Sequence, residues 1–192
     1  EEPWLSARNG IDEEAASNNP IDDNLIDDYF EKINKKYNLK NAEGIDQYIH
    51  DMREKMADTL NKKINKELAD LEMPNARFIT NIKKVEFNPN GIDEVEYFIC
   101  TNIGEEAKKL DKIASGGEMS RIMLAIKTVL ADTDSTPILI FDEIDTGISG
   151  KAAKSVGEKL KLIGKNHQVL CITHQPSIAA KGDQNYYISK DS

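Results

Sequence analysis

Two acidic residues follow the most apolar short run of the chain, and their placement suggests chemistry on phosphate. The run from Pro137 to Phe141 reads PILIF, and Asp142 and Glu143 come directly after it. Such a run predicts a strand of a parallel sheet covered on both faces, and open α/β folds bind ligands at the carboxyl ends of such strands. Phosphoryl transfer needs one carboxylate that holds Mg²⁺, often through water, and a second group that orients the attacking water. Asp142 suits the first role and Glu143 the second, although an acidic strand end can also be merely solvated.

A serine and two glycines form a second candidate for binding phosphate. Ser115-Gly116-Gly117 stands directly before a helix predicted over residues 118–131. Glycines allow main-chain N–H groups to approach an anion closely, and the N-terminus of a helix adds a favourable dipole. The hydroxyl of Ser115 adds a further polar group. The same three residues would also serve as an ordinary turn and helix N-cap, so this loop alone leaves both interpretations open.

Two further polar positions lie near predicted strand ends. Asp145 opens a glycine-containing turn before a helix predicted over residues 150–163, so it could cap that helix or belong to a binding loop. His174 directly follows the strand predicted over residues 168–173. A histidine there can donate a hydrogen bond to a phosphate and help polarise an attacking water. A histidine at a strand end is, however, more often structural.

The elements that must position these residues alternate between helix and strand from residue 112 onward. This alternation predicts an α/β fold with a mostly parallel sheet and flanking helices. A β-hairpin precedes it, because two runs of alternating apolar and polar residues flank the turn-forming Asn88-Pro89-Asn90-Gly91. The predicted elements of both parts cover residues 77–87, 94–101, 118–131, 138–141, 150–163, 168–173, 176–180 and 185–188.

Two helices are predicted before the hairpin. Residues 1–19 are acidic and irregular, and Asn19-Pro20 then provides a helix start for a segment that runs to Tyr37. Between Ile45 and Leu71 apolar residues recur every three or four positions, which predicts a longer helix. This helix either packs on a globular body or forms part of an antiparallel, coiled-coil-like arm with the first helix. We expect residues 1–75 to form the helical arm and residues 76–192 to form the α/β lobe.

In their order and spacing, the four polar segments resemble the signature motif, Walker B motif, D-loop and switch histidine of an ABC-type ATPase head. The surrounding segments IASGGEMSRIMLAIK, IFDEIDTGISG and THQPSIAA are similar to the RecN family of bacterial DNA-repair ATPases, which are related to SMC proteins. This resemblance covers most of the chain. It implies the C-terminal lobe of an ABC/SMC-type P-loop ATPase head, part of a coiled-coil arm, and a role in recombinational repair of DNA double-strand breaks.

The resemblance also implies a role for each candidate residue. Asp142 would hold Mg²⁺ through water, and Glu143 and His174 would be catalytic. The residues that would bind ATP are Ser115, Gly116, Gly117, Glu118 and Asp145. The signature loop would contact ATP held by a second copy of the head, so the site would form only in a dimer. Transporter ATPases usually carry Gln where this chain has Glu118, so the acidic residue points to the DNA-repair branch.

A Walker A motif, G-x-x-x-x-G-K-[ST], does not occur in this sequence. The similar run Gly147 to Ala152 has the wrong spacing, and Ala152 stands where a hydroxyl must reach Mg²⁺. We therefore expect a C-terminal fragment that is inactive alone and needs a partner lobe carrying Walker A. The alternatives are the head of another SMC or Rad50-like protein, and a non-catalytic module that dimerises through the arm. A transporter ATPase subunit is disfavoured by Glu118.

The composition restricts the partners and the compartment. The net charge is −9, so contacts with DNA would depend on local basic runs such as Lys62-Lys63, Lys83-Lys84 and Lys108-Lys109. Cys100 and Cys171 lie in apolar runs, which predicts that both are buried, reduced thiols. We expect no signal peptide and no membrane partner, because no apolar run reaches about 18 residues. These features indicate a cytoplasmic protein, and the resemblance to the RecN family implies a bacterial protein associated with the nucleoid.

Overall fold

The computed structural model describes residues 23–113, 115–131 and 133–189, with side chains from residue 27 onward. The irregular segment and the helix start that we predict at Asn19-Pro20 lie outside the described residues. Internal contacts divide the chain into two compact units, Glu1–Met52 and Arg53–Ser192, and the boundary falls within the long second helix.

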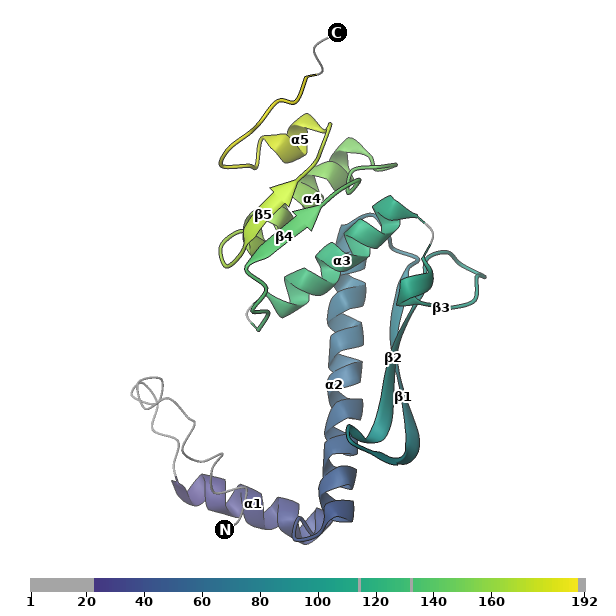
Figure 1. The fold of residues 1–192 in the computed structure, drawn as a ribbon, viewed down its shortest axis with the longest axis vertical. Helices are drawn as coiled ribbons and strands as arrows, with labels where there is room; N and C mark the ends of the chain where they lie inside the picture. Colours follow the sequence, from purple (N-terminus) through teal and green to yellow (C-terminus); the bar gives the residue numbers. More distant parts are fainter. Residues whose placement is uncertain (1–22, 114, 132, 190–192) are drawn as a thin grey trace. The chain divides into compact units, whose positions relative to one another are not determined.

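The first unit contains helix α1 (Asp23–Tyr37) and the beginning of helix α2 (Ala42–Asp70). Beside the turn between them, the Tyr37 ring meets Tyr48 edge-on at 5.3 Å, and its hydroxyl donates to Asp51 at 2.6 Å. Within this unit α1 lies across the beginning of α2 (Figure 1), and Ile45 and Ile49 remain 42% and 38% exposed. The antiparallel arm remains a prediction.

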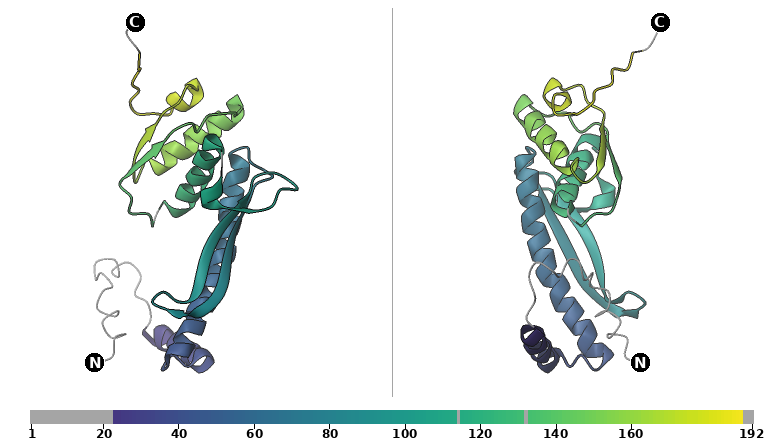
Figure 2. Two further views of the ribbon diagram at one scale, coloured as in Figure 1. Left: turned by 45° about the vertical axis from the view of Figure 1, so that its right-hand side comes forward. Right: turned by 90° about the vertical axis from the view of Figure 1, so that its left-hand side faces the viewer.

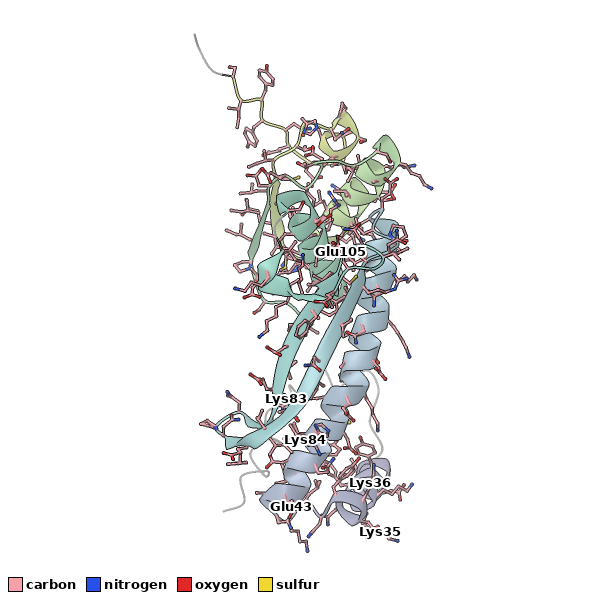
Figure 3. The ribbon with its side chains drawn as sticks, turned by 90° about the vertical axis from the view of Figure 1, so that its right-hand side faces the viewer. Lys35, Lys36, Glu43, Lys83, Lys84 and Glu105 are labelled. Atoms are coloured by element: carbon pink, nitrogen blue, oxygen red, sulfur yellow. The ribbon has the colours of Figure 1, made fainter. Side chains whose placement is uncertain are left out.

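The second unit begins with the remainder of α2 and a β-hairpin that runs along it (Figure 3). The hairpin consists of β1 (Arg77–Asn88) and β2 (Gly91–Cys100), which pair antiparallel as the sequence predicts. The short strand β3 (Lys108–Lys109) pairs with β2, so the sheet order is β1-β2-β3. A single 3₁₀ turn, η3 (Leu110–Lys112), follows β3.

Two asparagines one helical turn apart on α2 bind the free edge of β1. Asn65 accepts a hydrogen bond from the Phe78 amide at 2.7 Å and donates one to the Phe78 carbonyl at 3.1 Å. Asn61 accepts from the amide and the hydroxyl of Thr80 at 3.0 and 2.8 Å. Main-chain groups at the edge of a sheet otherwise stay unpaired. The two side chains therefore fix the hairpin to the helix.

The rest of the unit has the predicted α/β alternation. Its elements are α3 (Gly116–Leu130), β4 (Ile138–Phe141), α4 (Gly150–Ile163), β5 (Gln168–Cys171) and α5 (Pro176–Ala179). β4 and β5 are parallel neighbours, with Phe141 opposite Cys171 at their carboxyl ends. Helices α3 and α4 lie on the same side of this strand pair (Figures 1 and 2). The α/β fold class is confirmed.

Two details of the sheet differ from the prediction. Leu139 and Phe141 are buried under the helices, whereas Ile138 and Ile140 are 49% and 68% exposed, so only one face of β4 is covered. The strand predicted over residues 185–188 is wrong, because the described part of the chain places no strand beside this segment to complete its hydrogen bonds. In the first case the described structure lacks a layer that covers the second face of β4, and in the second it lacks an adjacent strand.

One hydrophobic core joins the second half of α2 to the helices and strands of the lobe. Its fully buried members include Ile64 and Leu68 of α2, Ile122 and Leu124 of α3, and Val156 and Ile163 of α4. Cys100 and Cys171 are both free thiols and are half-buried. No helix in the described ranges combines the length and the apolar character needed to cross a membrane.

We predict that Asn65→Ala will destabilise the second unit by about 1–2 kcal/mol, because the amide and carbonyl of Phe78 lose their partner at a partly buried edge. Urea unfolding and hydrogen exchange at the Phe78 amide measure this effect. Asn81→Ala is the matched control, since Asn81 is exposed on the same strand, and we expect it to change stability by less than about 0.5 kcal/mol. Equal effects of the two substitutions would contradict the assignment.

Candidate functional site

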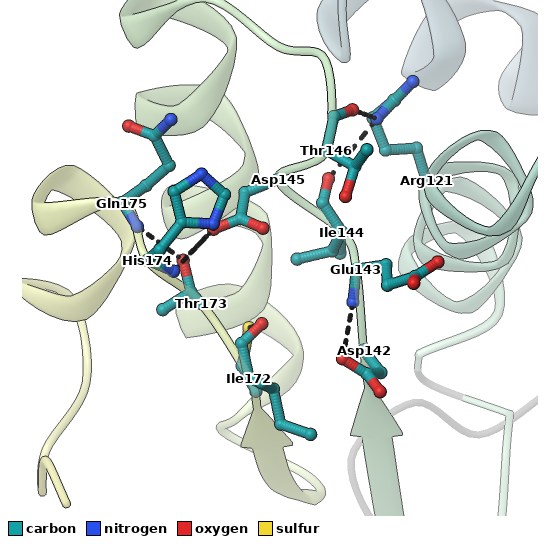
Figure 4. Close-up of polar contacts among 11 residues, drawn as sticks. Arg121, Asp142, Glu143, Ile144, Asp145, Thr146, Ile172, Thr173, His174 and Gln175 are labelled. Carbon is teal, nitrogen blue, oxygen red and sulfur yellow. Dashed lines mark hydrogen bonds and ion pairs between the residues drawn. The ribbon is translucent and has the colours of Figure 1, made fainter. Parts of the chain in front are cut away.

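The acid pair lies at the exposed carboxyl end of β4. Asp142 and Glu143 are both exposed, and the Asp142 carboxylate accepts a hydrogen bond from the Glu143 amide at 2.8 Å. Glu143 has φ +55°, a left-handed backbone that costs a non-glycine residue energy and often occurs at functional sites. The chain turns sharply here and presents both carboxylates at the end of the sheet (Figure 4).

The glycine loop lies directly against this turn. Ser115 is the N-cap of α3, and its hydroxyl accepts a hydrogen bond from the Glu118 amide at 3.4 Å. A Cβ atom on Gly116 would lie 2.1 Å from a carboxylate oxygen of Glu143, and one on Gly117 would lie 3.1 Å from the Glu143 carbonyl oxygen. A side chain at Gly116 would displace only the flexible carboxylate of Glu143, whereas one at Gly117 would crowd the main chain of the turn, so Gly117 favours the close approach of α3 to the acid pair.

Two side chains in the first turns of α3 hold the segment after β4. The Ser120 hydroxyl donates to the Asp142 carbonyl at 2.7 Å. Arg121 donates to the carbonyls of Thr146 at 2.9 Å and Ile144 at 3.4 Å. Arg121 is only 8% exposed. Burial lowers the pKa of its guanidinium, and the charge of Glu118 opposes this shift.

A buried carboxylate connects the ends of β4 and β5. Asp145 is 3% exposed, and one of its oxygens accepts hydrogen bonds from the Thr173 hydroxyl and, at 2.9 Å, from the His174 amide (Figure 4). The same oxygen lies 3.2 Å from Nδ1 of His174, whose side chain is 73% exposed. Burial acts to raise the pKa of Asp145, but the hydrogen bonds from Thr173 and His174 outweigh it, and the pKa lies below its ordinary value.

The carboxyl ends of the two strands carry a local negative charge. Burial raises the pKa of the Cys171 thiol to about 11, and the charges of Asp145 and Asp142 add to this shift. A negative field beside exposed carboxylates suits a divalent cation. Among the described residues, however, no cluster of three or more His, Cys, Asp or Glu side chains could hold a metal ion alone. Asp142 fits Mg²⁺ only in the usual shared arrangement, with water and phosphate oxygens as the other ligands.

The structure brings the residues that we predict from the sequence to one rim. Asp142 and Glu143 follow β4, and His174 follows β5, its parallel neighbour. Ser120 and Glu143 join the start of α3 to the same edge. The predicted rim residues are Ser115, Gly116, Gly117, Glu118, Asp142, Glu143, Asp145 and His174. Asp145 points inward, so its carboxylate holds the strand ends rather than facing solvent.

Sequence reasoning missed several of the residues that hold this rim. It gave no role to Ser120 or Thr173, and it treated Arg121 only as part of a motif. Spacing offered a signal, because residues three and four positions after Gly117 lie on the same face of a helix. The sequence shows no identifiable partner for His50 or His167, which predicts two surface residues; this prediction is wrong, since both are buried. Nδ1 of His167 lies 2.6 Å from the Thr136 carbonyl, so this ring fixes the segment before β4.

The solved structures that this chain matches include two Smc heads from Pyrococcus species. The Smc head domain of Pyrococcus furiosus, with an extended coiled coil and bound to the C-terminal domain of ScpA, is 25% identical with a TM-score of 0.48, over 69% of this chain and 31% of that one. The Smc head domain of Pyrococcus yayanosii, with a coiled coil and joint, is 23% identical with a TM-score of 0.49, over 86% of this chain and 34% of that one. No protein-family model matches the chain.

Among curated proteins, the DNA repair protein RecN of Halalkalibacterium halodurans is 43% identical over 144 residues, which are 72% of this chain and 26% of that protein. The DNA repair protein RecN of Bacillus subtilis is 39% identical over 159 residues, or 74% of this chain and 28% of that protein. The chain thus spans about a quarter of the length of the curated relatives that it matches. At this identity over nearly three quarters of its residues, the chain belongs to the RecN family.

Proposed function

We propose that this chain supplies the signature loop, the Walker B acids and the switch histidine of an ATP-hydrolysing site in a RecN-type DNA-repair ATPase. One observation carries the proposal: the glycine loop before α3, the exposed acid pair after β4 and His174 after β5 are joined on one rim of a parallel strand pair. Membership of the RecN family supports recombinational repair of DNA double-strand breaks as the process in which the whole protein acts.

Each side chain on the rim has a task in hydrolysis. Asp142 would hold Mg²⁺ through water. Glu143, whose side chain its left-handed backbone places beyond the strand end, would orient the attacking water. Bound Mg²⁺ supplies neutralisation of charge on the phosphate oxygens. His174 would donate to the γ-phosphate of ATP and help polarise the water. Its Nδ1 lies 3.2 Å from the Asp145 carboxylate, but the side chain is 73% exposed, so the rest of the ring faces solvent and can reach a phosphate.

The glycine loop would act on a different nucleotide from the acid pair. Ser115, Gly116 and Gly117 begin a 15-residue helix, and the first two are exposed. We propose that they contact the γ-phosphate of ATP held by a second copy of the head, with Glu118 completing the motif. ATP would thus join two heads, and hydrolysis would release them. Asp145 would act in this cycle by fixing the loop between the two strand ends.

A partner lobe must deliver the nucleotide. The sequence has no Walker A motif, and the chain spans about a quarter of its relatives. An apolar face of the strand pair is uncovered in the described structure, at Ile138, Ile140, Leu170 and Ile172. We propose that the lobe carrying Walker A, in the same full-length protein, covers this face. The division into an arm (residues 1–75) and a head lobe (residues 76–192) remains our prediction.

We further propose that the full-length protein binds DNA in the bacterial cytoplasm. The net charge of −9 disfavours broad contact with phosphates. Exposed lysine pairs such as Lys62-Lys63 on α2 would then provide the contacts with DNA.

We predict that Glu143→Gln in the full-length protein will lower the rate of ATP hydrolysis by about 100-fold or more, because water loses its orienting carboxylate. ATP binding should persist, so that dimers of ATP-bound heads accumulate. Steady-state hydrolysis and light scattering with ATP measure the two effects. Glu106→Gln is the control, since Glu106 is exposed and lies outside the rim motifs. Hydrolysis at the wild-type rate in Glu143→Gln would reject the assigned role.

The purified 192-residue chain should bind ATP weakly and hydrolyse none detectably, because it lacks the phosphate-binding loop. Adding the separately purified part of the protein that carries Walker A should restore hydrolysis. Robust turnover by the chain alone, abolished by Glu143→Gln, would show that the site is complete without a partner.

A further inference from the structure

Arg121 is a buried charged residue that lies outside the proposed catalytic set. It lies in the second turn of α3, is almost fully buried, and directs its guanidinium at two main-chain carbonyls of another segment. Burying a charge is costly unless its partners compensate well, and an apolar side chain would often stabilise such a position equally. The residues that carry the two carbonyls therefore indicate which segment Arg121 holds in place.

The two carbonyls flank Asp145. Arg121 binds Ile144 and Thr146, the residues immediately before and after the buried carboxylate. Asp145 in turn accepts hydrogen bonds from the hydroxyl of Thr173 and the amide of His174. The Thr173 hydroxyl also accepts from the Gln175 amide at 3.0 Å, so the main chain on both sides of His174 is fixed (Figure 4).

We propose that Arg121 is a positioning residue that holds the Asp145 turn from the side of α3, and through Asp145 sets the position of His174. The relay runs from the signature helix to the switch histidine within one copy of the chain, by way of four hydrogen bonds that join three segments: the start of α3, residues 144–146 and residues 173–175. Its catalytic meaning rests on the proposed function: a glycine loop that engages ATP on one head would thereby influence the histidine that serves the other nucleotide.

The relay predicts a spectroscopic response that does not depend on ATP hydrolysis. The chain has three histidines, His50, His167 and His174, so ¹⁵N-labelled imidazoles give three sets of signals. In the 192-residue chain, Arg121→Met and Arg121→Lys should shift or broaden the His174 signals and leave those of His50 and His167 in place. Buried His167 reports general damage to the lobe, because its ring bonds the Thr136 carbonyl away from the relay.

Arg77 provides a matched control. It also donates to two main-chain carbonyls, those of Pro74 at 2.8 Å and Ala76 at 2.7 Å, but it is exposed and lies in β1. Arg77→Met should leave all three histidines unchanged. Asp145→Asn tests the second half of the relay and should move His174 while His167 stays.

If Arg121→Met unfolds the chain, Arg121→Lys decides, since it keeps a charge on a shorter side chain that lacks Nη1, the nitrogen that donates to both carbonyls. His174 signals that stay in place in folded Arg121→Lys, while Asp145→Asn moves them, would overturn the role of Arg121. Failure of the proposed function would look different. Glu143→Gln would then leave hydrolysis by the full-length protein unchanged, whereas the response of His174 to Arg121 would persist.

Discussion

The buried carboxylate of Asp145 is the interaction on which the geometry of this lobe depends. Two parallel strands place their carboxyl ends side by side, but they do not by themselves fix the loops that leave them. Asp145 lies in the loop after β4 and accepts hydrogen bonds from the Thr173 hydroxyl and the His174 amide, which follow β5. Hydrogen bonds to a charged acceptor are stronger than neutral ones. One ionised side chain therefore holds the acid pair and His174 in a common frame.

The surrounding elements reinforce this frame from two sides. Helix α3 approaches the loop closely where Gly117 lacks a side chain, and Ser120 and Arg121 bind the main chain of the loop. On the other side, the loop ends at Ser149, which caps α4 and donates to Glu72, just after α2, at 2.7 Å.

Helix α2 also contacts the body of α4, since Lys159 pairs with Glu67 and Asp70. The same helix holds the hairpin through Asn61 and Asn65. The long helix thus contacts the hairpin, the core and the body of α4.

Local pattern was sufficient to predict most elements and most of the rim. The runs that became α2, β1, β2, β4 and α4 carry their own periodicity or apolar character, so tertiary structure had little to add. The predictions failed where a segment needs a neighbour that the described chain does not place there. Residues 185–188 have strand-forming side chains but no adjacent strand, and Ile138 and Ile140 have no covering layer.

The contacts within the site could not be read from sequence for a related reason. Thr173 and Asp145 are 28 residues apart, and Ser120 and Asp142 are 22 residues apart. Spacing can place each residue at the end of its own element, but only the crossover connection and the close approach at the glycines decide which atoms meet. The motifs therefore identified the residues. Only the structure shows which of their side chains face solvent and which bind the loop.

The central claim is that an ionised, buried Asp145 holds the two strand ends together, and pH-dependent unfolding tests it most directly. The folded-state pKa of Asp145 lies below its ordinary value of about 3.9, so its charge stabilises the fold. This stability is fully present above the ordinary pKa and is lost as the pH falls through the folded value. The free energy of unfolding should therefore differ between wild type and Asp145→Asn by a constant amount at neutral pH, and the difference should shrink in acid. A difference that stays constant as the pH falls well below 3.9 would contradict the account.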